Sequence, residues 1–392
     1  MKRLLFARVL LASLALSVAA IGHAGCDRST QPAGGRPAGQ VASARSSLPL
    51  YAFRGGQGKC GFVDATGHIR IAPRFDTAYD FSEGVAAALF EGKWGFIDPS
   101  GVFALQPTWD WTCGFSEGLA AVNVGGTIKH NDLVGGRWGY IDLSGRMIIP
   151  PQFREAGDFY DGVALATLEN GAQGVIDRRG KWVVPPPIIT NSLSFSEGLL
   201  PILMGDKGYA YIDPTGVVVI EPQFGFGYDF SEGLAGVRVS PEPGHEGEPD
   251  HGYIDRSGRI VIPPRFSNGR PFSEGLAAVN IGGHWEFLGP TGFYGGRWGY
   301  IDRSGKSVIE PRFEWAGQFS EGLAAVRVTA SEGGKVGFID RTGKFVIPPQ
   351  FEYVRGGFRG GVARVSDGSR YLLVSPTGEV VFSETDKEPW VR

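Results

Sequence analysis

Two kinds of acidic residue recur along the chain and are the first candidates for chemistry. They are Glu83, Glu117, Glu197, Glu232, Glu274 and Glu321, each within Phe-Ser-Glu-Gly, and Asp98, Asp142, Asp213, Asp255, Asp302 and Asp340, each near the end of a short apolar segment. Two carboxylates can share acid–base chemistry when unequal surroundings separate their pKa values. Residues that recur in every copy have similar surroundings, so we expect these carboxylates to hold turns by hydrogen bonds.

Histidine and cysteine give no alternative catalytic site. The histidines His68, His130, His245, His251 and His284 lack metal-ligand spacing, and we place His245 and His251 in a flexible acidic loop. Cys60 and Cys113 have no neighbouring histidine to activate them. They could form a disulfide with each other or act as two small apolar side chains, and both possibilities are open. Because no glycine-rich segment opens a helix, a phosphate-binding loop is not indicated. We therefore expect no catalytic residue, no metal and no cofactor.

These residues lie on a repeat, whose clearest copy is RWGYIDRSGKSVIEPRFEWAGQFSEGLAAV at residues 297–326. The copies are marked by turn glycines, at Gly67, Gly101, Gly145, Gly180, Gly216, Gly258, Gly305, Gly343 and Gly378. Most are spaced by roughly 35 residues, a period typical of repeat architectures. With 61 glycines, the chain is rich in turns. The repeat therefore replaces the ordinary expectation of two or three separate domains.

One copy predicts a meander of three short strands. Residues 298–302 and 306–310 flank a turn, Pro311 is expected to end the second strand, and residues 323–328 form the third. Three short strands are only marginally stable alone. Neighbouring copies must therefore cover the aromatic rings of each copy. The predicted core residues are Trp94, Trp138, Trp298, Phe115, Phe230, Phe272 and Phe319. The alternative for these aromatic residues is an exposed row that stacks on sugars.

The motif resembles that of the bacterial WG-repeat (KWG-repeat) proteins. The matching segments are Lys93-Trp94-Gly95-Phe96-Ile97-Asp98, Arg137-Trp138-Gly139-Tyr140-Ile141-Asp142 and Arg297-Trp298-Gly299-Tyr300-Ile301-Asp302. Cys60, Tyr209 and Val336 replace the tryptophan, and Ala210 replaces the glycine. The family is defined by its repeat and not by a reaction. The resemblance implies an extracytoplasmic β-repeat protein with an unassigned binding role.

The expected fold is all-β, a tandem array of about eight to nine β-meander repeats. Variable spacing between the copies favours an open β-solenoid or superhelix. A closed β-propeller is the alternative, because strands at residues 48–53 and 371–382 could pair and join the chain ends. Propellers typically have 4–8 blades, and nine copies would exceed this range.

The N-terminal segments predict export. Residues 1–25 have the basic start and apolar centre of a signal peptide, residues 26–47 form a polar linker, and residues 48–392 carry the array. Ala24-Gly25-Cys26 resembles the end of a lipoprotein signal, although His23 stands where leucine is usual. Lipidation of Cys26 and ordinary cleavage therefore both remain open. We expect a periplasmic or cell-surface protein.

Function is expected in three insertions, at residues 124–136, 240–251 and 281–296. Insertions in repeat proteins map to loops on one face, often the binding face. The third insertion carries the candidate partner-binding residues His284, Trp285, Phe287, Phe293 and Tyr294, with a loop that caps the core as the alternative. A formal net charge of −3 without a basic stripe argues against nucleic acid as a partner.

The sequence therefore predicts a non-catalytic binding or scaffolding protein of the bacterial cell envelope. A protein partner is the first hypothesis and a cell-wall or other glycan is the second. A hydrolytic enzyme is the third.

Overall fold

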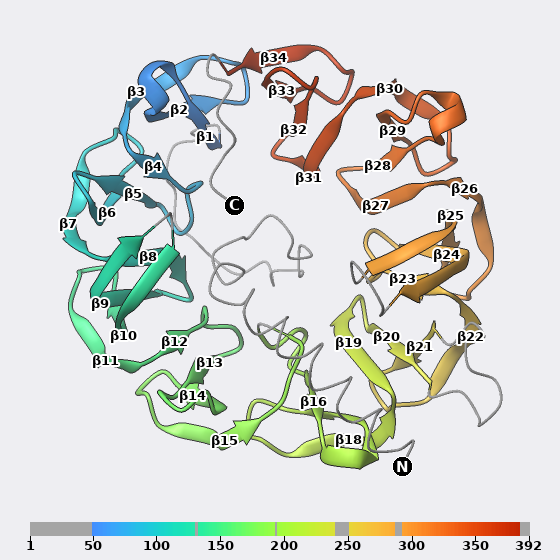
Figure 1. The fold of residues 1–392 in the computed structure, drawn as a ribbon, viewed down its shortest axis with the longest axis horizontal. Helices are drawn as coiled ribbons and strands as arrows, with labels where there is room; N and C mark the ends of the chain where they lie inside the picture. Colours follow the sequence, from blue (N-terminus) through green and yellow to red (C-terminus); the bar gives the residue numbers. More distant parts are fainter. Residues whose placement is uncertain (1–48, 130–131, 193, 240–250, 287–291, 385–392) are drawn as a thin grey trace, which may run out of the picture. The chain divides into compact units, whose positions relative to one another are not determined.

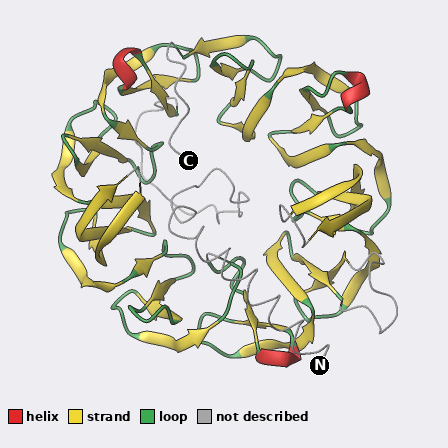
Figure 2. Ribbon diagram, viewed as in Figure 1, coloured by secondary structure: helices red, strands yellow, loops and turns green. Residues whose placement is uncertain are grey.

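A computed structural model describes residues 49–129, 132–192, 194–239, 251–286 and 292–384 (Figure 1). These residues form two compact units, 75–187 and 49–74 with 188–384. Both units consist of antiparallel strands joined by turns. The short 3-10 helices η2 (Gly56–Gly58), η3 (Gly205–Lys207) and η4 (Ala330–Glu332) lie between strands of the second unit (Figure 2). No described helix is long and apolar enough to cross a membrane. The expected signal peptide, the linker and Cys26 lie outside the described residues.

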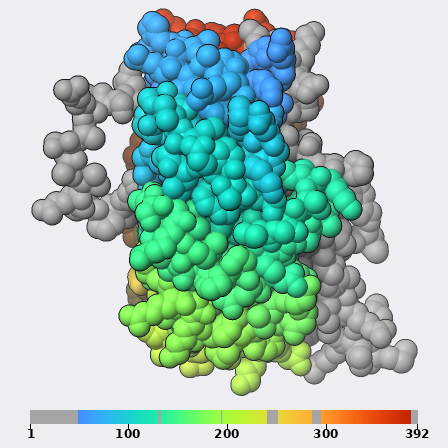
Figure 3. Space-filling model, turned by 90° about the vertical axis from the view of Figure 1, so that its left-hand side faces the viewer, coloured from blue at the N-terminus to red at the C-terminus, as the bar shows by residue number. Residues whose placement is uncertain are grey.

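The unit of residues 75–187 contains three four-stranded sheets. They are β4 (Thr77–Ala78), β5 (Ala86–Phe90), β6 (Lys93–Ile97) and β7 (Phe103–Trp109); β8 (Trp111–Ser116), β9 (Leu119–Lys129), β10 (Asp132–Asp142) and β11 (Met147–Phe153); and β12 (Glu155–Ala156), β13 (Val163–Thr167), β14 (Gln173–Asp177) and β15 (Trp182–Ile188). In Figure 3 they appear as adjoining bands coloured from cyan to green.

The other unit contains six sheets. The N-terminal one is β1 (Leu50–Arg54), β2 (Cys60–Asp64) and β3 (Ile69–Phe75). The others are β16 (Leu200–Leu203), β17 (Tyr209–Ile212) and β18 (Val218–Phe224); β19 (Phe226–Ser231), β20 (Leu234–Arg238), β21 (His251–Asp255) and β22 (Ile260–Phe266); β23 (Asn268–Gly269), β24 (Leu276–Glu286), β25 (Gly292–Asp302) and β26 (Ser307–Phe313); β27 (Trp315–Ser320), β28 (Leu323–Arg327), β29 (Val336–Ile339) and β30 (Phe345–Phe351); and β31 (Tyr353–Arg359), β32 (Val362–Ser366), β33 (Tyr371–Val374) and β34 (Val380–Ser383).

Most sheets have four strands instead of the expected three. The additional strand comes from the segment that follows the second predicted strand of each copy, for which we predicted no strand. In the clearest copy this segment forms β27, which pairs with β28. The strand at the Trp-Gly motif and the strand after it are then the third and fourth strands of a sheet.

Pro311 does not end its strand, as we had expected. β26 continues through Pro311 to Phe313 because it is the edge strand, where a missing backbone donor breaks no ladder bond. The pairing of β25 with β26 shifts register between Trp298 and Tyr300. At this irregularity the carbonyl of Ile309 approaches Gly299 so closely that a Cβ there would overlap the oxygen. The close approach explains the glycine of the Trp-Gly pair.

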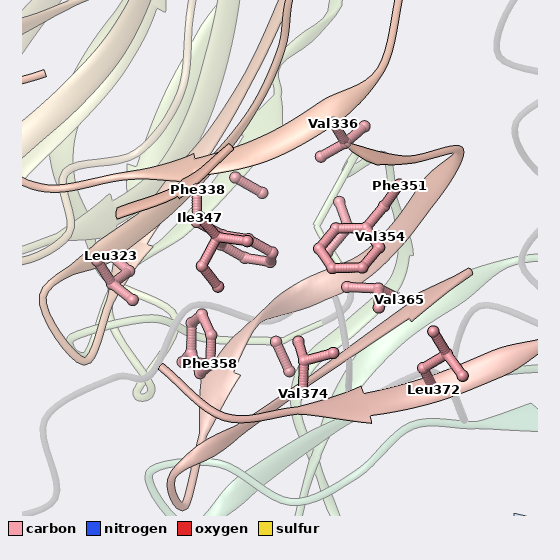
Figure 4. Packing of buried hydrophobic residues seen from close by; sticks show 12 residues of the cluster. Leu323, Val336, Phe338, Ile347, Phe351, Val354, Phe358, Val365, Leu372 and Val374 are labelled. Carbon is pink, nitrogen blue, oxygen red and sulfur yellow. The ribbon is translucent and has the colours of Figure 1, made fainter. Parts of the chain in front are cut away.

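The core lies between successive sheets. Trp94, Trp138 and Trp298 have 1%, 8% and 6% of their surface exposed, and Phe115, Phe230, Phe272 and Phe319 are also buried. Figure 4 shows one such cluster, in which Phe338 of β29 meets Phe358 of β31 with ring centroids 4.9 Å apart. Within each unit, one sheet therefore covers the rings of the next, and this mutual cover is the source of stability that a single meander lacks.

The first and last sheets contact each other within one unit. The Tyr51 hydroxyl of β1 donates hydrogen bonds to the carbonyls of Arg359 and Gly360, and Phe53 lies edge-on to Phe382 with ring centroids 4.7 Å apart. The terminal strands do not pair into one sheet, which was the possibility raised with the propeller alternative, because β1 to β3 and β31 to β34 form separate sheets.

The fold class is therefore an all-β, nine-bladed β-propeller, and the open solenoid that we favoured is not supported. An open array would leave the apolar faces of both terminal sheets uncovered, whereas here Tyr51, Phe53 and Val63 share one cluster with Val362 and Leu373. The usual range of 4–8 blades describes how often such folds occur and sets no physical limit.

Candidate functional site

The recurrent aspartates hold the turns after the Trp-Gly strands. Oδ1 of Asp302 accepts hydrogen bonds from the backbone N–H of Ser304, from the Ser304 hydroxyl and from the N–H of Lys306. The Ser304 hydroxyl is the main cause that lowers the pKa of Asp302. Equivalent turn bonds are made by Asp98, Asp142, Asp213, Asp255 and Asp340. These carboxylates therefore remain ionised and are used in structure.

The recurrent glutamates link one copy to the next. Each has a positive φ between 51° and 54°, and the side chain accepts a hydrogen bond from backbone N–H groups in the following copy. Glu321, for example, binds the N–H groups of Gly360 and Gly361 at 2.5 and 2.9 Å. The same bond joins Glu83 to Gly118, Glu117 to Gly162, Glu197 to Gly233, Glu232 to Gly275 and Glu274 to Gly322. We had expected these residues to hold local turns; their bonds instead span neighbouring sheets.

The predicted binding loop at residues 281–296 is largely a β-hairpin. β24 and β25 stay paired from Leu276 and Asp302 out to Glu286 and Gly292, and this pairing places His284 opposite Tyr294 and Trp285 opposite Phe293. The His284 side chain is exposed. Phe287 lies outside the described residues, and the structure describes only the backbone of Trp285, Phe293 and Tyr294. The strands bring four of the five predicted residues together in pairs.

The first insertion forms a matching hairpin from β9 and β10. Beyond Asn123, where its pairing with β8 ends at Trp111, the hairpin continues as a two-stranded extension to Lys129 and Asp132. This extension exposes three apolar side chains, since Val124, Ile128 and Val134 are 45%, 38% and 47% exposed. Such side chains on a two-stranded extension offer a surface for another molecule.

Asp110 fixes the base of this hairpin. Its carboxylate accepts hydrogen bonds from the N–H groups of Gly125 and Gly126 at 2.6 and 3.2 Å, and it forms a 2.5 Å ion pair with Lys93. The exposed apolar residues beyond it therefore stand on a stem that is tied to the neighbouring sheet.

A second candidate lies where a charged side chain meets two indoles. The guanidinium of Arg270, just after β23, stands 5.3 Å from the ring of Trp298 in β25 and 5.3 Å from that of Trp315 in β27. Arg270 and Trp315 are partly exposed, whereas the Nε of Arg270 is buried without a hydrogen-bond partner. Nothing in the repeat pattern distinguished Arg270.

Two further buried polar groups belong to the same unit. Burial raises the pKa of Asp229, in the first strand of its sheet, β19, to about 6, and its Oδ1 has no hydrogen-bond partner. His251 is not in a flexible loop, as we had expected, because it begins β21 and is 1% exposed. Burial, with repulsion from Arg238 as a second cause, lowers the pKa of His251 to about 3. His251 occupies the tryptophan position of its copy, which the segment His-Gly-Tyr-Ile-Asp could have shown.

The remaining candidates give no site. Cys60 is a buried thiol, so the bridge to Cys113 that we left open does not form. Within the described residues no group of three or more His, Cys, Asp or Glu side chains is arranged to hold a metal ion. An open cavity of about 490 Å³ beside Arg312, Glu332 and Lys344 has mixed polar and apolar walls. The Arg312 guanidinium there already donates to the carbonyl of Gly343.

The sheets, their Trp-Gly strands and their Phe-Ser-Glu-Gly links define a β-propeller built from one recurrent sequence unit. The family model described as "WG containing repeat" matches residues 61–94, 94–127, 138–171, 174–207, 209–240, 252–285, 298–329 and 337–371. The chain belongs to this family. A search of curated protein sequences finds no significant relative.

Solved structures match this chain at low sequence identity. A crystal structure of a eukaryotic initiation factor has 12% identity and a TM-score of 0.57, and the match covers 87% of this chain and 96% of the other. The crystal structure of BamB from Moraxella catarrhalis has 12% identity and a TM-score of 0.39, with 87% and 97% covered. At such identities the first likeness concerns the fold alone.

Proposed function

We propose that this chain is a non-catalytic binding module that recognises a protein partner through its two extended hairpins. The observation that carries the proposal is the exposure of Val124, Ile128 and Val134 on the extension of β9 and β10. Apolar side chains concentrated on one projecting element can be buried by another protein, which removes their surface from water. In the second hairpin Ile281 is 50% exposed near the equivalent base.

The engagement of the recurrent carboxylates also supports a non-catalytic function. The aspartates accept several turn bonds each, and the glutamates bind the backbone of the next copy. A general acid or base must exchange protons with a substrate, and disengaging these groups would break the contacts that hold the sheets.

Export to the cell envelope is part of this proposal and is supported by the sequence of residues 1–25 alone. Processing of Cys26 is a separate question. Sensitivity of maturation to globomycin would indicate lipidation, whereas maturation that ignores the drug would indicate ordinary signal cleavage.

The test compares two triple variants of the full chain. Val124→Ser, Ile128→Ser and Val134→Ser would remove the apolar surface of the hairpin. Val102→Ser, Val217→Ser and Val219→Ser serve as the control, because these residues are similarly exposed, at 61%, 59% and 47%, but lie outside the hairpins. Proteins captured from envelope extract would be identified, purified and titrated directly against each variant.

We expect a purified partner to bind the wild type and the control alike, and to bind the hairpin variant at least about tenfold more weakly, a loss of about 1.4 kcal/mol. Equal affinity for all three proteins would remove the hairpin from the interface and refute the proposal.

A glycan ligand is the second candidate function. It is favoured by Trp111 and Trp315, which begin the first strands of their sheets and are partly exposed, since sugars stack on such rings. Binding on a glycan array that survives the hairpin substitutions but is lost in Trp315→Ala would support this alternative.

A further inference from the structure

Arg270 is a charged group without an ionic partner in the described structure. No described carboxylate forms an ion pair with it, and no described residue accepts a hydrogen bond from its guanidinium. The neighbouring titratable groups that influence its pKa are the phenols of Tyr300 and Tyr253, whose own pKa values are raised by burial, so both are neutral near pH 7. The positive charge is therefore not neutralised by the protein around it.

The backbone on which Arg270 stands is held from two sides. The Tyr253 hydroxyl donates a 2.8 Å hydrogen bond to the carbonyl of Arg270, and the amide of Gln318 donates one of 3.3 Å to the carbonyl of Pro271. The guanidinium lies near two indole rings within the range of cation–π attraction. Its position is thus set before any ligand arrives.

A charge is not needed to fill this position. In the sheet of β4 to β7, Tyr79 occupies the equivalent place and stacks on Trp94, with ring centroids 5.0 Å apart and an interplanar angle of 12°. A neutral ring therefore provides the same packing. An arginine here bears the desolvation cost of a partly buried cation, which a merely structural position would avoid.

We propose that Arg270, flanked by Trp298 and Trp315, binds a carboxylate of an acidic segment in a protein partner. A planar guanidinium forms paired hydrogen bonds to a carboxylate, and bonds between such charged groups are the stronger ones. The indoles restrict the access of water and strengthen the attraction. That the carboxylate belongs to a protein rests on the function proposed above. The carboxylate-binding site itself rests on Arg270 alone.

The experiment uses the full chain and three probes. They are the peptide acetyl-Glu-Glu-Glu-amide, its glutamine counterpart acetyl-Gln-Gln-Gln-amide, and D-glucuronate as an acidic sugar. Binding is followed by calorimetric titration and by the indole N–H signals of Trp298 and Trp315 in ¹H–¹⁵N spectra, assigned with Trp→Phe variants. Arg270→Tyr removes the charge and reproduces the packing of Tyr79. Arg259→Gln is the matched control, because Arg259 is a largely exposed arginine of the preceding copy, paired with Asp255.

The glutamate peptide should shift both indole signals in the wild type, and the glutamine peptide should not. Affinity should fall at least about tenfold in Arg270→Tyr and stay within about twofold in Arg259→Gln. Arg270→Lys should also bind more weakly, because an ammonium lacks the planar pair of donors. Binding should weaken as salt is raised.

No binding by the wild type to either acidic probe, or equal affinity in Arg270→Tyr, would overturn the proposal. Binding of glucuronate without the peptide would overturn the protein partner and assign the carboxylate to a sugar. These outcomes are independent of the hairpin test, since Arg270 can bind the peptide whether or not the hairpin variants retain a partner.

Discussion

The Ser231 hydroxyl donates a buried 2.7 Å hydrogen bond to the carbonyl of Phe272, 41 residues further along the chain. The same bond recurs between the serine of one Phe-Ser-Glu-Gly motif and the phenylalanine of the next, at Ser82, Ser116, Ser196, Ser273 and Ser320. The glutamate of the same motif binds a backbone N–H of the next copy, as Glu232 does at Gly275. Serine and glutamate together therefore make the motif a connector between sheets.

Ser231→Ala should therefore destabilise the junction between the sheets of β19 to β22 and β23 to β26. The substitution leaves the Phe272 carbonyl without its side-chain donor, at a cost of about 1–2 kcal/mol. Urea unfolding and amide hydrogen exchange of residues near Phe272 would measure it. Ser304→Ala is the control, because that exposed turn hydroxyl can be replaced by water and its loss should cost less than about 0.5 kcal/mol. Equal effects of the two substitutions would contradict the connector role.

Tyr51→Phe tests the contact between the terminal sheets. The variant keeps the ring in its apolar cluster and removes only the bonds to the carbonyls of Arg359 and Gly360. We expect a loss of about 1 kcal/mol, with faster hydrogen exchange in both β1 and β31. Tyr353→Phe should have little effect, since Tyr353 is 53% exposed. Unchanged exchange in β31 would show that the hydroxyl does not hold the two sheets together.

Gly299→Ala tests the role of glycine in the Trp-Gly pair. A methyl group would overlap the carbonyl oxygen of Ile309, so the strands β25 and β26 must separate, at a cost of about 1–3 kcal/mol. Gly56→Ala is a suitable control, since no atom lies within 4 Å of the added group. Ala210, at the equivalent position in β17, shows that one sheet adjusts to a methyl group, so Gly299→Ala should fold but unfold at lower urea concentration. A midpoint equal to that of the wild type would refute the steric explanation.

The repeat made the local structure predictable from sequence. The turn of Asp302 and Gly305 depends on residues a few positions apart, so its pattern is visible in one copy. The contact of Tyr51 with Gly360 depends instead on residues 309 positions apart, and no local pattern shows whether such ends meet. For this reason the sequence could not decide whether the array of repeats closes.

The candidate sites also differ in how far they could be predicted from the sequence. The hairpins were visible as insertions, although their pairing was not expected, because glycine-rich segments usually indicate loops. His251 could have been recognised from the motif that it begins, but the acidic segment before it suggested a loop. Arg270 had no signal, because its significance comes from Trp298 and Trp315, which the fold brings to it from two other strands.

His251→Phe should stabilise the protein, and more so in acid. Both ring nitrogens of His251 are buried without hydrogen-bond partners among Tyr228, Tyr253 and their neighbours, so at pH 7 a phenyl ring should raise the free energy of unfolding by about 1 kcal/mol. The pKa of His251 is about 3 in the folded protein and 6.5 as a free side chain. The unfolded chain therefore binds a proton that the folded protein excludes.

The contribution that depends on a neutral His251 to the free energy of unfolding is therefore fully present above about pH 6.5. It is lost as the pH falls from there towards 3. At pH 5 the wild type should have lost up to about 2 kcal/mol by this route, whereas His251→Phe cannot lose it. Urea unfolding of both proteins at pH 7, 6 and 5 measures the difference, and the groups common to both cancel in the comparison. Gly56→Ala provides the control, because it changes no titratable group and the added methyl meets no other atom, so its difference from the wild type should stay constant with pH. A constant difference for His251→Phe as well would show that the buried imidazole takes up its proton without opposing the fold.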